Sequence, residues 1–284
     1  QLESTAKFQF CRDRRHTTAK IIKNVFISFF SRHGCKVTKK FYLCDMKLTY
    51  IFHSGFAIEA DNITIIIDYW QDPANIVPRL LQNSGSIYVL SSHFHQDHFN
   101  PEILRWKDKR PGIHYILSKD IWRHRRNLIN DISSNMTFLA KGQTYKDEFI
   151  YVEAFGSTDV GVSWYIETNS KRIFHSGDLN NWLWLDDSTP EESARYQQMF
   201  LGELTDIHKK VKTMDVAMFP VDSRIGTDYM RGARQFVNKF RIGLFVPMHF
   251  TAQPIVDAWA FKDYAISKDT NFFEIKKESD TIEF

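Results

Sequence analysis

From Met46 to the C-terminus, short apolar runs alternate with segments in which apolar residues recur at helical spacing. Runs rich in Ile, Val, Phe and Tyr, bounded by Gly, Asn or Asp, predict strands at 48–53, 56–60, 64–70, 86–92, 113–118, 136–140, 148–155, 161–168 and 172–177. Two later strands are predicted at 215–222 and 244–250. Helices are predicted at 73–82, 101–107, 119–129, 190–210, 227–240 and 253–264. Grouped strands followed by strand–helix alternation predict a layered α/β protein.

Residues 1–45 differ in composition from the rest of the chain. They contain 10 of the 37 Lys and Arg residues but 3 of the 34 Asp and Glu residues, so they carry a net charge of +7 while residues 46–284 carry −4. This basic segment fits three interpretations: sequence read from upstream of a true start at Met46, a presequence, or an ordered arm. We favour the first, because the strand pattern begins directly at Met46. The expected organisation is a basic extension at 1–45, outside the core, and one domain at 46–284.

The composition also argues against several classes of protein. No apolar run approaches the roughly 20 residues needed to cross a bilayer, so we expect no membrane-spanning segment. An acidic main body has no general attraction for nucleic acid. The basic cluster at 122–127 has no interleaved aromatic residues, which favours a solvated helix face. All three cysteines lie within residues 1–45, and without a secretion signal we expect a cytoplasmic protein.

The segment 88–100, YVLSSHFHQDHFN, concentrates metal-binding side chains directly after a predicted strand. Its pattern His-x-His-x-Asp-His places His93, His95, Asp97 and His98 within six positions. On an extended backbone positions 93, 95 and 97 point to one side, and the turn returns the last two residues to the same point. Imidazole and carboxylate groups suit zinc and related divalent ions. An exposed histidine-rich loop would explain one or two histidines, but not this density of potential ligands.

A catalytic metal site needs ligands from elsewhere in the chain, and three residues are candidates. Asp178 follows a predicted strand within HSGD, His249 ends another within FVPMHF, and Asp159 occupies a Gly-flanked turn within FGSTDVG. Each has an ordinary alternative, because Asp is a common turn residue and a lone histidine at a strand end is often a satisfied core residue.

Further residues are candidates for supporting roles. His53 and His175 are suited to orient metal ligands through hydrogen bonds, with core packing as an equal alternative. Trp182 and Trp184 follow the HSGD segment closely and are candidates for the wall of a substrate pocket, although such Trp pairs are as often part of the core. Arg224 is a candidate for bidentate binding of a substrate carboxylate or phosphate, and its alternative is a solvated loop charge.

Taken together, these segments resemble the metallo-β-lactamase-fold hydrolase superfamily. The resemblance covers residues from about 46 to the end and rests on HSGFAIEADNITIIIDYW, the HFHQDH signature, the HSGD segment and a late strand ending in histidine, in that order. The long helix after HSGD and the stretch FPVDSRIGTDYMRGARQF more weakly resemble small lactonase-like members. The resemblance implies a four-layer αββα sandwich.

The resemblance also implies roles for the matching positions. The implied ligands are His93 and His95 for a first metal, Asp97, His98 and His249 for a second, and Asp178 as a bridge between them. The superfamily usually supplies another histidine to the first metal from the turn that reads GSTDVG in this chain. Asp159 is the expected substitute, and Ser157 is the weaker choice.

The implied function is that of a metal-dependent hydrolase. A hydroxide bridging two divalent ions, with Zn²⁺ preferred and Mn²⁺ or Fe²⁺ as alternatives, would cleave an ester, lactone or phosphodiester bond of a small anionic molecule. Asp97 would also orient the nucleophile or accept its proton. Two other functions stay open: an RNA- or DNA-processing nuclease on the same fold, and a non-catalytic metal-binding or sensor protein. An open coordination position would distinguish a catalytic site from a closed one.

Overall fold

The structure is a computed structural model, and it describes residues 25–30, 36–41, 46–129, 135–250 and 254–284. The chain divides into two compact units, Gln1–Leu43 and Cys44–Phe284. In the first unit, β1 (Val25–Phe30) and β2 (Lys36–Phe41) form an antiparallel hairpin. The rest of the 1–45 extension lies outside the described residues, and the exclusion of this extension from the core stays a prediction.

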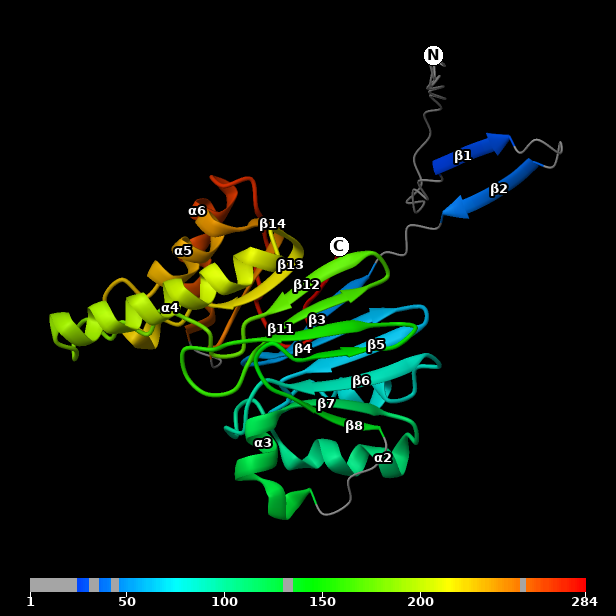
Figure 1. The fold of residues 1–284 in the computed structure, drawn as a ribbon, viewed down its shortest axis with the longest axis horizontal. Helices are drawn as coiled ribbons and strands as arrows, with labels where there is room; N and C mark the ends of the chain where they lie inside the picture. Colours follow the sequence, from blue (N-terminus) through cyan, green and yellow to red (C-terminus); the bar gives the residue numbers. More distant parts are fainter. Residues whose placement is uncertain (1–24, 31–35, 42–45, 130–134, 251–253) are drawn as a thin grey trace. The chain divides into compact units, whose positions relative to one another are not determined.

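The described residues of the second unit form two seven-stranded sheets (Figure 1). The first sheet has the order β16 (Thr281–Glu283), β3 (Lys47–Phe52), β4 (Gly55–Ala60), β5 (Ile63–Ile67), β6 (Ser86–Ser91), β7 (His114–Ser118) and β8 (Met136–Leu139). The second has the order β15 (Asn271–Phe272), β14 (Arg241–Met248), β13 (Thr213–Pro220), β12 (Lys171–His175), β11 (Ser163–Thr168), β10 (Tyr151–Phe155) and β9 (Thr144–Lys146). Each sheet pairs antiparallel in one half and parallel in the other, from β5 to β8 and from β12 to β15.

Alternating side chains bury both faces of the first sheet. Ile63, Ile65 and Ile67 of β5 belong to the large core cluster that is shared with the second sheet, whereas Ile66 belongs to the cluster under the outer helices. Successive side chains of a strand point to opposite faces, so a strand buried on both sides reads as a nearly continuous apolar run. This explains the run of isoleucines in β5.

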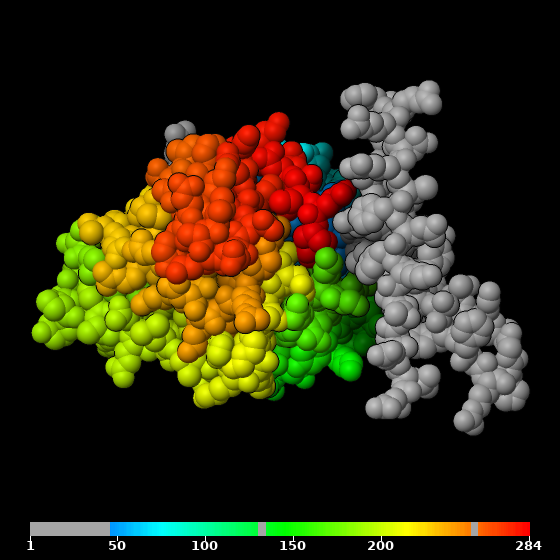
Figure 2. All heavy atoms as spheres, turned by 90° about the horizontal axis from the view of Figure 1, so that it is seen from above, coloured from blue at the N-terminus to red at the C-terminus, as the bar shows by residue number. Residues whose placement is uncertain are grey.

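Helices cover the outer face of each sheet and complete four layers (Figure 1). The helices on the first sheet are α1 (Val77–Leu80), α2 (Trp106–Lys109) and α3 (Lys119–His124), and those on the second are α4 (Pro190–Lys210), α5 (Arg231–Lys239) and α6 (Lys262–Ile266). Short 3₁₀ helices are η1 (Pro101–Arg105), η2 (Arg126–Leu128), η3 (Ser223–Ile225) and η4 (Pro254–Phe261). The segment from α4 to the C-terminus makes up most of the face seen in Figure 2. The predicted αββα sandwich is confirmed. No described helix is both long and apolar enough to cross a membrane.

The helix boundaries follow from their caps. Thr189 and Glu192 form a capping box around Pro190, so α4 has the predicted bounds. The helix predicted at 73–82 is shorter, because the carboxylate of Asp72 accepts hydrogen bonds from the amides at 76 and 77, both at 2.8 Å, and α1 begins only there. The helix predicted at 253–264 is mostly the 3₁₀ helix η4. The predicted range of α4 was therefore confirmed, whereas the turn before α1 was not predicted.

Glu59 of β4 links strand β3 and helix α1 through ion pairs. Its carboxylate accepts hydrogen bonds from Arg79, at 2.7 and 3.0 Å, and lies 3.0 Å from the Nζ of Lys47 on β3. Burial opposes the charged form of Glu59, but Arg79, Lys47 and Asn83 outweigh it and lower the pKa of Glu59 to about 2.

We expect Glu59→Gln to destabilise the protein at neutral pH and to have a smaller effect in acid. A carboxyl group with a lowered folded-state pKa stabilises the fold above its unfolded-state pKa of about 4.3, and this contribution disappears as the pH falls towards the folded-state value. Because the Arg79 side chain is 51% exposed, solvent screening limits the effect to about 1 kcal/mol. Urea unfolding of both proteins at neutral pH and at about pH 3 measures the difference, and an equal difference at both pH values would contradict the prediction.

Candidate metal centre

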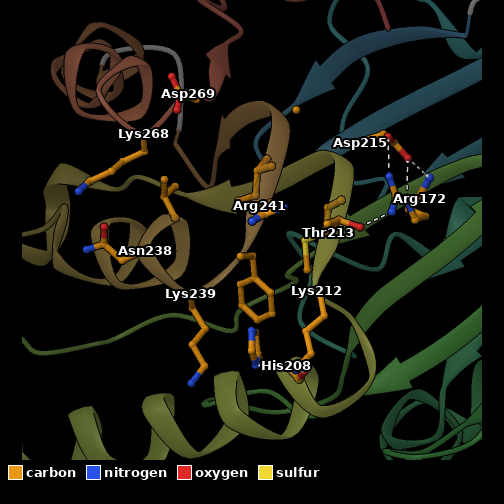
Figure 3. Close-up of a pocket in the computed structure, with 15 residues that line it drawn as sticks. Arg172, His208, Lys212, Thr213, Asp215, Asn238, Lys239, Arg241, Lys268 and Asp269 are labelled. Carbon is orange, nitrogen blue, oxygen red and sulfur yellow. Dashed lines mark hydrogen bonds and ion pairs between the residues drawn. The ribbon is translucent and has the colours of Figure 1, made fainter.

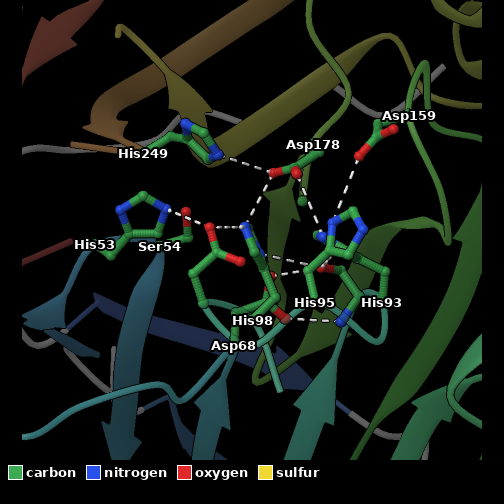
Figure 4. A network of polar contacts seen from close by, with 12 residues as sticks. His53, Ser54, Asp68, His93, His95, His98, Asp159, Asp178 and His249 are labelled. Carbon is green, nitrogen blue, oxygen red and sulfur yellow. Dashed lines mark hydrogen bonds and ion pairs between the residues drawn. The ribbon is translucent and has the colours of Figure 1, made fainter. Parts of the chain in front are cut away.

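The candidate metal ligands gather at one edge of the sandwich, where strands of both sheets end (Figure 4). His93 follows the end of β6, Asp178 follows β12, His249 follows β14, and Asp159 lies in the loop between β10 and β11. Neighbouring parallel strands end at the same edge of a sheet, and polar residues beyond these ends therefore meet in space. This topology joins segments that are separated by more than half of the chain.

Asp178 is the residue on which the histidine side chains converge (Figure 4). Its Oδ2 lies 3.3 Å from the Nε2 of His93, and its Oδ1 lies 3.0 Å from the Nε2 of His98 and 3.3 Å from that of His249. All four residues are buried. Asp178 thus occupies a position between the two expected metal sites.

Two groups of four side chains each offer donor atoms within 4.8 Å of one another. The first group consists of His93, His95, Asp159 and Asp178, and the second of His53, Asp97, His98 and His249. Every ligand expected from the sequence lies in one of the two groups. Asp159 stands with the two histidines of the first group, at the place expected for the missing histidine. The hydroxyl of Ser157, the weaker choice, accepts a hydrogen bond from the amide of Asp159 at 3.3 Å.

One side of the site faces solvent. The side chains of His95 and Asp159 are 42% and 45% exposed, with 3.6 Å between Nδ1 and Oδ2, and the side chain of Asp97 is 36% exposed. The residues around Asp178, by contrast, are buried. The site is therefore anchored in the interior and open on its outer side.

Asp68, which the sequence analysis did not single out, organises the buried side. It follows β5, and its carboxylate accepts hydrogen bonds from the amide of Ser92 at 2.7 Å, the hydroxyl of Ser92 at 2.6 Å and the Nδ1 of His98 at 2.7 Å. Since the Ser92 hydroxyl donates to Asp68, its oxygen accepts from the Nδ1 of His93 at 3.0 Å. Both rings are thereby fixed with Nε2 directed towards Asp178.

Asp222 fixes the ring of His249 in a similar way, and the sequence did not single it out either. It follows β13, and its Oδ2 accepts from the Nδ1 of His249 at 2.9 Å. Asp68 and Asp222 share a signal in the sequence: each is an acidic residue directly after an apolar strand, in TIIID and in FPVD. A carboxylate at the end of a buried strand needs a partner, and here the partners are candidate metal ligands.

The two histidines expected to orient ligands have different surroundings. His53 lies 3.3 Å from Asp97, between Nε2 and Oδ2, and belongs to the second donor group, so it also offers donor atoms to a metal, and its orienting role stays a prediction. His175 contacts the backbone instead: its Nδ1 accepts from the amide of Gly177 at 3.1 Å and its Nε2 donates to the carbonyl of Ser54 at 2.8 Å. His175 therefore shapes the turn that carries Asp178 without a hydrogen bond to a candidate ligand.

The residues expected to bind substrate also lie beside the site. The ring of Trp182 is 5.2 Å from that of His249 and stacks on Trp184 with a centroid distance of 6.4 Å. Trp184 is exposed, which suits a pocket wall. Arg224 donates from Nε and one Nη to the carboxylate of Asp222 at 2.8 and 2.7 Å. The fork of Nε and Nη of Arg224 is therefore occupied by Asp222 and does not bind a substrate group bidentately. The other Nη of Arg224 is left to contact substrate.

The basic cluster at 122–127 has a different environment from the one expected. His124 stacks on Phe94 with a centroid distance of 4.2 Å, and the guanidinium of Arg125 lies 5.3 Å from the centre of the same ring. Phe94 in turn lies next to His95, with 4.7 Å between ring centres. Within the cluster, the guanidinium of Arg126 lies 4.9 Å from the ring centre of Trp122, and the histidine-rich loop supplies Phe94 as a second aromatic partner. The cluster thus borders the exposed side of the site.

Two glycines allow the close approach of loops that the site requires. Gly161 has φ +77°, and a Cβ there would lie 2.2 Å from the carbonyl oxygen of Ser92. Gly177 has φ +52°, and its Cβ would lie 2.8 Å from the Cβ of Ser92. Any side chain at either position would be strained and would push the loops carrying Asp159 and Asp178 away from the histidine cluster.

The buried carboxylates favour positive charge at this place. Burial favours the neutral ring of His249, but Asp178 and Asp222 outweigh it and raise the pKa of His249 to about 9. Burial also favours the neutral ring of His98, but Asp178 and Asp68 outweigh it and raise the pKa of His98 well above its ordinary value. Burial opposes ionisation of Asp178, yet His98, His249 and His93 hold its pKa well below the usual range. A divalent cation bound here would supply the same compensation and release the protons.

The donor set fits a metal ion on an independent criterion. The Nε2 atoms of His93 and His98 and the Oδ1 of Asp178 are buried and form no hydrogen bond of ordinary geometry among the described residues, although both nitrogens lie 3.0 to 3.3 Å from the Asp178 carboxylate. Buried polar atoms are rarely left without a partner, and an ion is one ordinary explanation when they are. Imidazole nitrogen and carboxylate oxygen are ligands that zinc, manganese and iron accept.

Fold and site together define the class of protein, and a family comparison agrees. The family described as the beta-lactamase superfamily domain matches residues 47–249. The chain belongs to this superfamily and has the metallo-β-lactamase fold of its metal-dependent hydrolases.

Several known proteins are similar to this chain over most of its length. A UPF0173 metal-dependent hydrolase of Desulforamulus reducens is 24% identical over 234 residues, which are 76% of this chain and 90% of that protein. Igni18, a metallo hydrolase from the archaeon Ignicoccus hospitalis, has a TM-score of 0.61 at 19% identity and covers 84% of this chain and 98% of its own. CmlA, a diiron β-hydroxylase from Streptomyces venezuelae, has a TM-score of 0.58 at 15% identity over 87% of this chain and 55% of its own. At these identities the two structures show a common fold.

We expect Asp68→Asn to weaken metal binding by about 10- to 100-fold, because the amide no longer holds the Nδ1–H of His98 as a carboxylate does. Thermal unfolding of the metal-free protein and a metal titration with a competing chelator would separate loss of affinity from loss of fold. Asp147→Asn is a suitable control, since Asp147 also accepts hydrogen bonds from side chains, those of Tyr88 and Tyr145, but lies outside the donor groups. Unchanged affinity in Asp68→Asn would show that Asp68 does not orient a ligand.

Proposed function

We propose that this protein hydrolyses an ester, lactone or phosphodiester bond of a small molecule with the help of two divalent metal ions. The observation that carries the proposal is the convergence of two donor groups on the buried Asp178. One group would hold the first ion through His93, His95 and Asp159, and the other would hold the second through Asp97, His98 and His249, with Asp178 shared. His53 is a further donor beside the second ion.

The chemistry divides between the metals and the chain. Bound divalent ions make hydroxide available at neutral pH and polarise the bond that is cleaved. The chain holds the ligand rings in place through Asp68 and Asp222, so little reorganisation is needed during the reaction. Asp97 lies on the exposed side with Oδ2 facing His53, and it is the residue that we propose to orient the attacking water or accept its proton.

Zn²⁺ is the metal that we propose first, with Mn²⁺ or Fe²⁺ as alternatives. Histidine nitrogens dominate the donor set, which suits zinc. The carboxylate of Asp159, at the place where a histidine is usual, makes the first group richer in oxygen and suits the harder ions as well. A protein with a similar fold is described as a diiron enzyme, which is compatible with this alternative.

The surroundings of the open side support a small anionic substrate. Trp182 and Trp184 provide a stacked aromatic wall beside His249. Arg224, through its unengaged Nη, and Arg125, above Phe94, provide positive charge on two sides. Exposure of His95, Asp97 and Asp159 leaves the site accessible, which favours an enzyme over a closed metal sensor. A cytoplasmic location remains part of the proposal.

A nuclease is the second candidate, because one observation favours it. The exposed cluster of Arg123, His124 and Arg126 borders the open side of the site, and Phe94 adds an aromatic ring to it. Cationic side chains with a neighbouring aromatic ring suit a single-stranded nucleic acid. The net charge of −4 on residues 46–284 argues in the opposite direction, so the small molecule is preferred.

Metal analysis and a substrate screen test the main proposal. We expect purified protein to bind more than one equivalent of metal and to hydrolyse a member of a panel of lactones, phosphodiesters and thioesters, with an RNA oligonucleotide added for the second candidate. His95→Ala removes a ligand without disturbing the buried residues, and a loss of several kcal/mol of transition-state stabilisation lowers the rate by more than about 100-fold. His114→Gln, outside both donor groups, is the control. Metal content well below one equivalent, together with unchanged activity in His95→Ala, would overturn the proposal.

The role of Asp159 has its own test. We expect Asp159→Ala to weaken binding of one of the two metals by at least about tenfold, and Asp159→His to retain both, since imidazole replaces one donor by another. Val160→Ala, which removes no donor atom, is the matched control from the same loop. If metal stoichiometry and affinity are the same in Asp159→Ala as in the parent, Asp159 is not a ligand.

A further inference from the structure

A second concave site lies at the opposite edge of the second sheet, where β13 and β14 begin (Figure 3). It is a hollow of about 1050 Å³, formed between the C-terminal ends of α4 and α5, the first residues of the two strands and the turn after α6. Both strands are eight residues long and end at Pro220 and Met248, shortly before Asp222 and His249 on the metal side. At about 3.3 Å per residue the hollow lies roughly 25 Å from the metal centre, too far for one small molecule to occupy both.

Positive charge is concentrated in this hollow. Lys212, Lys239, Arg241 and Lys268 line it, and none of them has a carboxylate within ion-pair distance among the described residues. Arg172 also lines it but is neutralised by Asp215 through hydrogen bonds of 2.8 to 3.0 Å. The remaining acidic lining residue is Asp269, so the hollow keeps an excess of three positive charges. This excess occurs in a body whose net charge is −4.

The cations are held close together by the backbone. The amide of Arg241 donates to the carbonyl of Lys212 at 3.1 Å, so the two residues are neighbours across the ends of β13 and β14. Like charges side by side destabilise a sheet unless an anion compensates them. The pKa of His208 is lowered, first by partial burial and then by Lys212 and Lys239, as expected beside a region of positive potential.

The C-terminal ends of the neighbouring helices compensate only part of this positive charge. Cations are favourable at helix C-termini, and α4, α5 and α6 all end near the hollow. Each such end contributes at most about half a negative charge, so three ends cancel roughly half of the excess. Arg241, moreover, lies on a strand and not in the last turn of a helix.

We propose that the hollow binds a small polyphosphate, either free or as the di- or triphosphate group of a nucleotide. Several cations on four separate elements suit an anion with more than one charged group, because a single carboxylate would leave most of them uncompensated. Lys212, whose Nζ already donates to the carbonyl of His208, and Lys268 act as point charges. The planar fork of Arg241 offers two parallel hydrogen bonds to one phosphate. The site is independent of the hydrolase proposal.

Calorimetric titration of the full-length, metal-loaded protein with pyrophosphate and with ATP tests this site, and adenosine serves as the uncharged control. We expect both phosphate compounds to bind with dissociation constants below about 1 mM and with an affinity that falls as salt rises, and we expect adenosine not to bind.

Arg241→Ala combined with Lys268→Ala should weaken the binding of both phosphate compounds by at least about tenfold. Lys276→Ala combined with Lys277→Ala, which removes two charges outside the hollow, should leave the affinity unchanged. Pyrophosphate binding with weak or no ATP binding would identify the free ion as ligand, whereas similar affinities would identify the phosphate group itself.

Asp178→Asn separates this site from the metal centre. We expect the variant to lose bound metal and still bind pyrophosphate, so the two proposals can fail independently. Binding that is lost in Asp178→Asn and kept in the Arg241 and Lys268 double variant would place the anion at the metals and overturn the proposal. Absence of pyrophosphate binding, or equal binding of adenosine, would also overturn it.

Discussion

Carboxylates buried at the ends of apolar strands require compensating charges and hydrogen bonds, and the rest of the site supplies them. Asp68 is fully buried and Asp178 is 6% exposed. An ionised carboxylate in such a place costs several kcal/mol unless charges and hydrogen bonds compensate it. Here the compensation comes from His93, His98 and His249, whose rings are fixed by it. The contacts that compensate the charge of the carboxylates therefore also direct the Nε2 atoms of three histidines towards Asp178.

Backbone strain occurs at the same places. His53, Asp68 and His249 have φ values of 57°, 48° and 69°, in the left-handed region that side chains other than glycine rarely adopt. Such conformations persist when surrounding structure over-determines them, and they are concentrated at functional sites. The three residues each follow a strand of the sandwich, and the regular sheet hydrogen bonds before them hold the strained positions. Rigid strands thus support a site that is buried on one side and open on the other.

The parallel halves of the sheets explain why chemistry collects at their edges. Strands β12, β13 and β14 run in one direction, so the residues before them meet at one edge and the residues after them at the other. The edge after the strands gathers carboxylates and histidines, and the edge before them gathers lysines and arginines. The two ends of these strands therefore carry side chains of opposite charge in two separate regions.

Much of this was determined by the sequence alone. The HFHQDH segment is local, the capping box of α4 spans four residues, and the continuous apolar run of β5 is typical of a strand buried on both faces. Asp178, His249 and Asp159 were recognisable as polar residues next to apolar strands. Asp68 and Asp222 carry the same signal but were not recognised, because nothing local distinguishes an acidic residue that fixes a ligand from one that ends a turn.

The tertiary structure decided the remaining relations. His53 stands among the potential ligands because β3 and β4 turn beside His249, and Arg125 gains an aromatic partner because α3 packs against the loop of Phe94. The cationic hollow joins residues from α4, α5, β14 and the turn after α6, none of which forms a basic run in the sequence. Side-chain type and strand period act over a few residues and are readable in the chain, whereas these contacts depend on which strands pair, and that is set by the packing of the whole core.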